Sequence, residues 1–151
     1  MPRSELPLRT VADTNTVVSG LLWHGNPRRV LDAAREGALQ LYTTAILLAE
    51  IDEVLQRPKF AQRLSLAGVS SHTLVLGYAA LASLIEPAVI EPVITVDPDD
   101  DAVLACAVAA RAAAIVSGDS HLLDLEEYQG IPVLTAAQLL ARLKSVRVDD
   151  T

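Results

Sequence analysis

The chain has 151 residues, of which 51% are hydrophobic and 3% aromatic, and this predicts one compact domain with a core of Leu, Val, Ile and Ala. A net charge of -7 and a pI near 4.8 argue against a large basic surface that binds nucleic acid by charge alone. Cys106 is the single cysteine, so the sequence offers no internal disulfide, and this residue is expected to be a small buried hydrophobe.

The N-terminal stretch MPRSELPLRT lacks the apolar segment of a signal peptide. No segment of the chain reaches about 18 uninterrupted apolar residues, the length that a membrane-spanning helix needs. We therefore expect a cytoplasmic protein that does not contact a membrane.

Strands and helices are expected to alternate in the first half of the chain. Residues 6–14 and 38–44 have the composition of strands, and the first of these ends at Asp13. The segment 26–37 between them has Pro27 near its start and Gly37 at its end, which is typical of a helix. Further helices are expected at 43–58, 59–68 and 70–85.

The second half continues this alternation. Prolines within 86–96 indicate a loop with a short edge strand, and an apolar helix is expected to end at about Ala112. Strands are expected at 113–119 and 131–135. A last helix follows, where Thr135 and Gln138 have capping-box spacing, and then a frayed tail.

This order of elements predicts an α/β fold. Because strands that alternate with helices form parallel sheets with both faces covered, we expect a three-layer α/β/α sandwich around a central, mainly parallel sheet. The chain shows no linker or internal repeat. It is therefore expected to form a single domain over 1–151, with its core at about 8–145.

Acidic residues stand at the ends of expected elements. Asp13 and Asp119 each end a strand, and ligands of parallel sheets bind beyond the carboxyl ends of the strands, so both are expected at one rim. Either aspartate could instead form only an Asx turn or a cap. Glu50 lies beside the apolar stripe of the helix expected at 43–58. The alternative is that Glu50 lies on a solvent-exposed face of this helix and has no role in a site.

The segment TVDPDDDAVL places three consecutive aspartates, 99–101, before an apolar helix. Acids near a helix N-terminus interact favourably with the helix dipole, but one or two would suffice. Like charges repel by about 1 kcal/mol per pair at 4 Å in water. We expect part of the run to bind a metal ion and the rest to cap the helix, with capping alone as the alternative. Clustered carboxylates with few histidines and no paired cysteines suit Mg²⁺ or Mn²⁺.

Four segments in chain order resemble the motifs of PIN-domain ribonucleases: VADTNTVVSGLL, AEIDEVLQRPKF, DPDDDAVLACA and IVSGDSHLL. The resemblance covers about residues 8–145. The last two motifs resemble the branch described as toxins of toxin–antitoxin systems, related to VapC-like toxins. This resemblance implies a metal-dependent endoribonuclease that hydrolyses single-stranded RNA, uses Mg²⁺ or Mn²⁺ and is paired with an antitoxin protein.

The resemblance also assigns roles to single residues. Asn15 would orient the loop of the first acid, and Ser117 would lie near the metal. The residues implied to be catalytic and to hold the metal are Asp13, Glu50, Asp100 and Asp119.

The third of these acids is ambiguous between Asp100 and Asp101. Successive helix residues differ by about 100° in direction, so both cannot point equally well into one site. Asp100 is preferred as the ligand, and Asp101 is kept as a further metal residue. His121 stands where relatives often carry an acid, which leaves a second metal site open.

Because the net charge of the protein is -7, RNA is expected to bind through a small local group of basic residues. Arg28 and Arg29 are expected to contact RNA near the rim, with contributions from some of Arg57, Lys59 and Arg63. The helices in 43–85 are expected to form a two-fold homodimer. The resemblance to toxins implies that an antitoxin lays an amphipathic helix into a groove and places a basic side chain among the acids.

Two alternatives remain open. A phosphohydrolase of the haloacid dehalogenase type is suggested by DTNT and GDSHLLD, but its chemistry needs a second aspartate at position 15, which is Asn15. No clear lysine precedes the SGD segment either. The other alternative is a non-catalytic PIN-like module that binds RNA or protein and uses the acidic rim only for structure.

Overall fold

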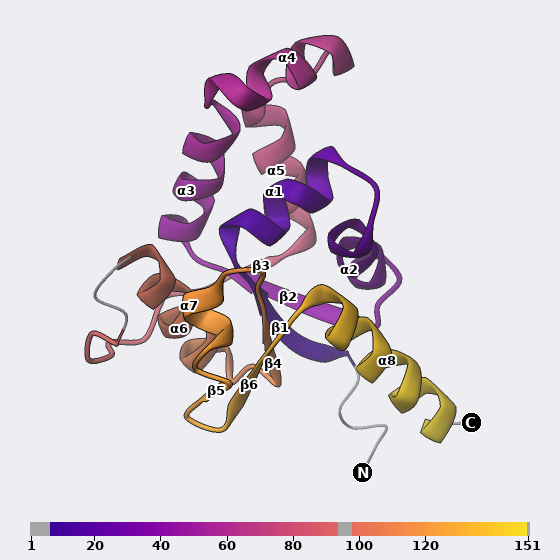
Figure 1. The fold of residues 1–151 in the computed structure, drawn as a ribbon, viewed down its shortest axis with the longest axis vertical. Coiled ribbons are helices and arrows are strands. Elements are labelled where there is room, and N and C mark those ends of the chain that lie inside the picture. The colour runs from indigo at the N-terminus through magenta and orange to yellow at the C-terminus, as the bar shows by residue number, and fades with distance from the viewer. Residues whose placement is uncertain (1–6, 94–97, 151) are drawn as a thin grey trace.

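A computed structural model describes residues 7–93 and 98–150 (Figure 1). Within these residues a six-stranded sheet has the order β3-β2-β1-β4-β6-β5. All neighbouring strands pair in parallel except β5 and β6, which are antiparallel at one edge. The strands are β1 Leu8–Ala12, β2 Leu39–Thr43, β3 Ser83–Leu84, β4 Ala114–Val116, β5 Glu127–Tyr128 and β6 Ile131–Leu134.

Helices connect these strands. Among the described residues no single helix is long and apolar enough to cross a membrane, and the helices Pro58–Ala67 and Ser71–Leu81 meet that test only as a pair bent by 83°. The helices are α1 Thr14–Leu22, α2 Asn26–Arg35, α3 Ala45–Leu55, α4 Pro58–Ala67, α5 Ser71–Leu81, α6 Pro98–Ala110, α7 Ser120–Leu123 and α8 Ala136–Asp150.

Two hydrophobic clusters lie on opposite faces of the sheet. Ala12 and Val116 belong to a cluster that contains buried residues of α1, α2, α3, α5 and α8. Val11 and Ile115, one residue earlier in the same strands, belong to a second cluster with residues of α6 and α7. Because successive strand residues point to opposite faces, this alternation defines helices on both faces of the sheet (Figure 1). The predicted three-layer α/β/α sandwich is confirmed.

The capping box predicted at Thr135 and Gln138 is confirmed, and α3 also begins at a side-chain cap. The Thr44 hydroxyl accepts a hydrogen bond from the Leu47 backbone N–H at 3.2 Å and caps α3. At the start of α8 the Thr135 N–H donates to Gln138 Oε1 at 2.9 Å, and the Gln138 N–H donates to Thr135 Oγ1 at 3.1 Å. The helix then continues through Asp150, so the prediction of a frayed tail before that residue is wrong.

The edge strand lies earlier than the sequence predicted. The helix expected at 70–85 ends at Leu81, because Ser83 and Leu84 pair with Tyr42 and Thr43 of β2. No strand forms in the described part of the proline-containing segment, residues 86–93, and residues 94–96 lie outside the described residues. Proline has no N–H to donate to a neighbouring strand, which favours the earlier position.

Helix α1 was not predicted, because its sequence TNTVVSGLL combines β-branched residues with a glycine, and both favour a helix only weakly. It forms because Val17, Val18 and Leu22 are buried in the core. The helix also packs very closely on α2. A Cβ atom added at Gly20 would lie 2.8 Å from Leu31 Cδ1 and 2.9 Å from the Pro27 carbonyl oxygen.

We predict that Gly20→Ala destabilises the protein by about 1–3 kcal/mol, because the new methyl group would push α2 away from α1. The matched control is Gly77→Ala in α5, where a Cβ would meet no atom within 4 Å. That variant should be more stable by up to about 1 kcal/mol, since alanine is the better helix former. Urea unfolding of both variants measures the difference. Equal stabilities would contradict the close α1–α2 contact.

Candidate metal centre

The candidate centre lies at the carboxyl ends of β1 and β4, which are neighbours in the middle of the sheet. The chain runs from β1 outward through β2 to β3 on one side and then crosses back to β4 on the other side of β1, so this is a switch point of the topology. Asp13 directly follows β1, and its N–H donates to the Val116 carbonyl at 3.0 Å. Ser117 directly follows β4. The two strand ends are thus placed side by side, as expected for one rim.

Asp13 is a buried carboxylate, only 4% exposed. One of its oxygens accepts from the Thr16 N–H at 2.9 Å and caps α1, and the other accepts from the Ser117 hydroxyl. Burial raises the pKa of Asp13, the two hydrogen bonds oppose that rise, and the nearby Asp119 carboxylate adds to it. The site therefore disfavours the charge of Asp13 in the absence of a cation.

Ser117 connects the two strand ends. Its hydroxyl is buried, donates its one proton to Asp13 and accepts from the Asp119 N–H at 2.9 Å. A single side chain thus fixes both the carboxylate of Asp13 and the backbone that carries Asp119.

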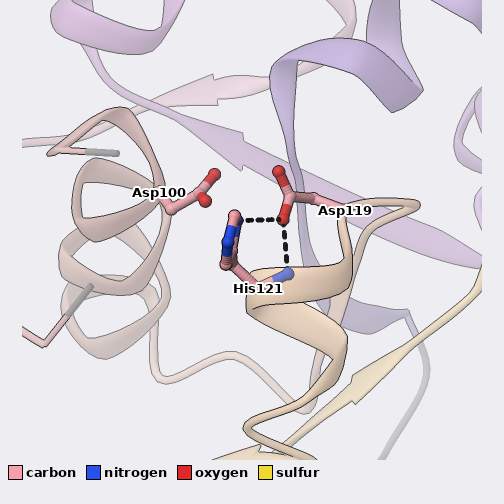
Figure 2. A group of neighbouring side chains, drawn as sticks. All are labelled: Asp100, Asp119 and His121. Atoms are coloured by element: carbon pink, nitrogen blue, oxygen red, sulfur yellow. Dashed lines mark hydrogen bonds and ion pairs between the residues drawn. The ribbon is translucent and has the colours of Figure 1, made fainter. Parts of the chain in front are cut away.

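Among the described residues, Asp100, Asp119 and His121 form a group that could hold a metal ion (Figure 2). Each offers one ligand atom, and these atoms lie within 4.8 Å of one another. Two ligands on opposite sides of a Mg²⁺ ion stand about 4.2 Å apart, because each bond is about 2.1 Å long. Two carboxylates and an imidazole are suitable donors for a divalent ion. The residues present therefore fit such an ion.

The three consecutive aspartates at the start of α6 have different surroundings. Asp99 is exposed, whereas Asp100 is buried and belongs to the metal-suited group. The Asp101 carboxylate accepts from the Val93 N–H at 3.2 and 3.3 Å. The turn of about 100° between successive helix residues accounts for this division. The structure thus brings Asp100 to the group and directs Asp101 to the preceding loop.

Glu50 lies half-buried on α3. Leu47, one turn before it, packs in the cluster that contains Val103 and Leu104 of α6. Within the described residues, Glu50 and Asp13 stand outside the group whose ligand atoms lie within 4.8 Å. Their binding to a metal stays a prediction.

The residues expected to contact RNA have different surroundings. The Arg28 guanidinium donates to the Gly20 and Leu21 carbonyls, both at 3.1 Å, and thereby satisfies the end of α1. Arg63 likewise donates to the Leu22 carbonyl and lies over the Trp23 ring at 5.4 Å. Arg29 is exposed and donates to Asn26 Oδ1 at 3.3 Å. Arg28 and Arg63 therefore satisfy the last carbonyls of α1, a structural role that the sequence did not predict.

Two further residues of the motifs can now be placed. Asn15, predicted to orient the loop of Asp13, is exposed in the first turn of α1. His121 was not assigned as a ligand from the sequence. The Asp119 carboxylate accepts from the His121 N–H at 2.6 Å at the start of a helix of four residues, which is too short to give a signal in the sequence.

A family model described as PIN domain matches residues 9–121, and this chain belongs to the PIN-domain family. PIN domains bind divalent metals and are typically metal-dependent nucleases. Among solved structures, the chain is similar to the PIN domain of RRP44 from T. brucei, with a TM-score of 0.47, 16% sequence identity, and coverage of 94% of this chain and 84% of that chain. No curated protein matches the sequence.

We predict that Asp13→Asn makes the metal-free protein more stable at pH 7. The pKa of Asp13 is raised in the folded state, so its ionisation opposes folding once the pH exceeds the unfolded value of about 3.9. Asparagine removes that charge and still caps the helix. The thermal midpoint in chelator should rise by a few degrees, and the gain should vanish as the pH falls below about 3.9, where Asp13 is protonated in both states.

The control for this prediction is Asp13→Ala, which removes the charge and the cap together. It should be less stable than Asp13→Asn by about 0.5–2 kcal/mol, the usual value of an N-cap. If Asp13→Asn unfolds below the wild-type temperature, the carboxylate contributes to folding and the assigned role of burial is incorrect.

Proposed function

We propose that this PIN domain is a metal-dependent endoribonuclease that hydrolyses phosphodiester bonds of single-stranded RNA. The observation that carries the proposal is the convergence of Asp100, Asp119 and His121 beside the buried Asp13, at the carboxyl rim of a parallel sheet. The family assignment supports nuclease chemistry, and the single-strand specificity is our proposal.

The ion would be held by Asp100, Asp119 and His121, with Asp13 and Glu50 as further acids. A bound Mg²⁺ or Mn²⁺ supplies contacts to phosphate oxygens, a more acidic bound water and stabilisation of the leaving oxygen. Asp13 can take part because each of its carboxylate oxygens keeps an acceptor site after accepting one hydrogen bond. Ser117 and the Thr16 N–H hold that carboxylate in one orientation.

The surroundings of the potential nucleophiles favour attack by water. The Ser117 hydroxyl is only 1% exposed and donates to the buried Asp13 carboxylate, so it is not accessible to a phosphodiester. Cys106 is fully buried, and burial raises the pKa of its thiol to about 12, so it remains protonated. Haloacid dehalogenase chemistry would need a carboxylic acid where the exposed Asn15 stands.

The decisive experiment compares Asp100→Asn with Asp99→Asn. Asp100 is buried in the metal-suited group, and Asp99 is the exposed neighbour in the same helical turn. With labelled single-stranded RNA and Mn²⁺, Asp100→Asn should lose more than about 100-fold in cleavage rate, since even indirect partners of metal ligands are worth about 10–100-fold. Asp99→Asn should keep nearly full activity.

Chelator should abolish cleavage by the wild type. Undiminished cleavage in excess chelator would exclude a metal-dependent mechanism. Release of phosphate from a small phosphomonoester without RNA cleavage would favour the phosphohydrolase alternative, and RNA binding without cleavage would favour the non-catalytic module.

We propose that Arg29 contacts RNA. Arg28 is the second candidate, and its guanidinium already donates to the Gly20 and Leu21 carbonyls. Arg29→Ala should weaken RNA binding and lower the slope of log affinity against log salt by about 1, because one phosphate contact is lost. Arg35→Ala is the matched control, since Arg35 lies on the same helix and pairs with Asp32 at 2.7 Å. Fluorescence anisotropy at several salt concentrations measures both. Identical slopes would remove Arg29 from the RNA surface.

We further propose that the protein is the toxin of a toxin–antitoxin pair and forms a homodimer. The toxin role is supported by the motif resemblance. A groove of about 740 Å³ between the end of α1, α4 and α5 offers an antitoxin helix apolar and basic residues, including Leu21, Leu74 and Lys59. Exposed Ile46, Leu76 and Leu84 support self-association through the region 43–85. A monomer by light scattering at tens of micromolar would exclude the dimer.

A further inference from the structure

We propose that His121 is a nitrogen ligand of the divalent ion, and that it makes this centre selective for a first-row transition ion such as Mn²⁺ over Mg²⁺. The inference rests on the metal site of the proposed function and names its cofactor class more narrowly. It does not depend on the RNA chemistry.

The position of His121 follows from the start of α7. Asp119 caps this helix and accepts from the His121 N–H at 2.6 Å, so both residues are fixed relative to each other at one helix end. Figure 2 shows the carboxylates of Asp100 and Asp119 pointing toward one another, with the imidazole beside them. Asp100 comes from a different helix, α6. The three side chains therefore converge from two independent elements.

The imidazole has room to bind an ion. Its Nδ1 lies 3.4 Å from the Asp119 carboxylate, longer than a well-formed hydrogen bond of about 2.7–3.2 Å. The His121 side chain is 48% exposed, so one side of the ring faces solvent, from which an ion enters. A simple surface ion pair between His121 and Asp119 is the competing explanation, and it predicts no nitrogen bound to a metal.

The donor set decides the choice of ion. Mg²⁺ prefers oxygen ligands, retains several waters and loses them reluctantly. A neutral imidazole nitrogen suits transition ions, whose affinities for such sites rise along the series from Mn²⁺ to Cu²⁺. Carboxylates such as Asp100 and Asp119 accept either class of ion. The discrimination in this centre is therefore expected to come from the single nitrogen of His121.

The first measurement uses the wild-type protein loaded with Mn²⁺ alone. Pulsed electron paramagnetic resonance should detect hyperfine coupling between the manganese and a directly bound nitrogen. The coupling should be absent in His121→Asp, which replaces the nitrogen by a carboxylate oxygen, and retained in His72→Ala. His72 is an exposed histidine at the start of α5 and is the matched control.

The second measurement titrates Mn²⁺ and Mg²⁺ into the same three proteins by calorimetry. In His121→Asp the ratio of the Mg²⁺ to the Mn²⁺ dissociation constant should fall by about tenfold or more, because the donor that discriminates between the ions is lost. His72→Ala should keep the wild-type ratio. Circular dichroism checks that the variants are folded.

The outcomes separate this inference from the proposed function. Absence of nitrogen coupling in the Mn²⁺-loaded wild type overturns the inference, whether or not RNA is cleaved. An unchanged ratio of dissociation constants in folded His121→Asp overturns it as well. Nitrogen coupling together with a lowered ratio in the variant supports the inference even if the protein cleaves no RNA, and in that case only the proposed function fails.

Discussion

The buried carboxylate of Asp13 is the constraint on which the rest of the site depends. Burial opposes its charge, and a buried carboxylate is tolerated only when hydrogen bonds satisfy its oxygens. One bond comes from the first turn of α1 and the other from Ser117 at the end of β4. Both strands must therefore end at the same level, and α1 must begin immediately at Asp13. The positive end of the helix dipole then also lies beside the carboxylate.

The position of α1 next to Asp13 also depends on basic side chains at the other end of the helix. The last carbonyls of α1, like those of any α-helix, have no partner within the helix, and Arg28 and Arg63 donate to them from α2 and α4. The close contact at Gly20 completes the attachment. Two of the twelve Lys and Arg residues thus stabilise the helix that carries the acid. Their guanidinium groups are thereby less available to bind RNA.

The sequence was sufficient to predict what depends on local pattern. Alternating elements, the caps at Thr44 and Thr135 and the rim position of Asp13 follow from residue types and spacing. What it missed depends on contacts between distant segments. β3 consists of Ser83 and Leu84 and exists only because β2 is beside it, and the short elements α7 and β5 have too few residues to show a period. The place of His121 beside Asp100 required the relative position of α6 and α7, which no local pattern contains.

The three aspartates in the first turn of α6 show how neighbouring like charges can be tolerated when their surroundings differ. Asp99 is exposed, so water screens its charge. Asp101 accepts from the Val93 N–H, which connects the first turn of α6 to residue 93. Asp100 is buried, and its carboxylate belongs to the group whose ligand atoms, with those of Asp119 and His121, lie within 4.8 Å of one another. Any ion that binds the folded centre more tightly than the unfolded chain stabilises the fold by mass action. The same ion would reduce the negative potential that opposes the approach of a polyanionic RNA, so metal binding, folding stability and substrate access depend on one local charge.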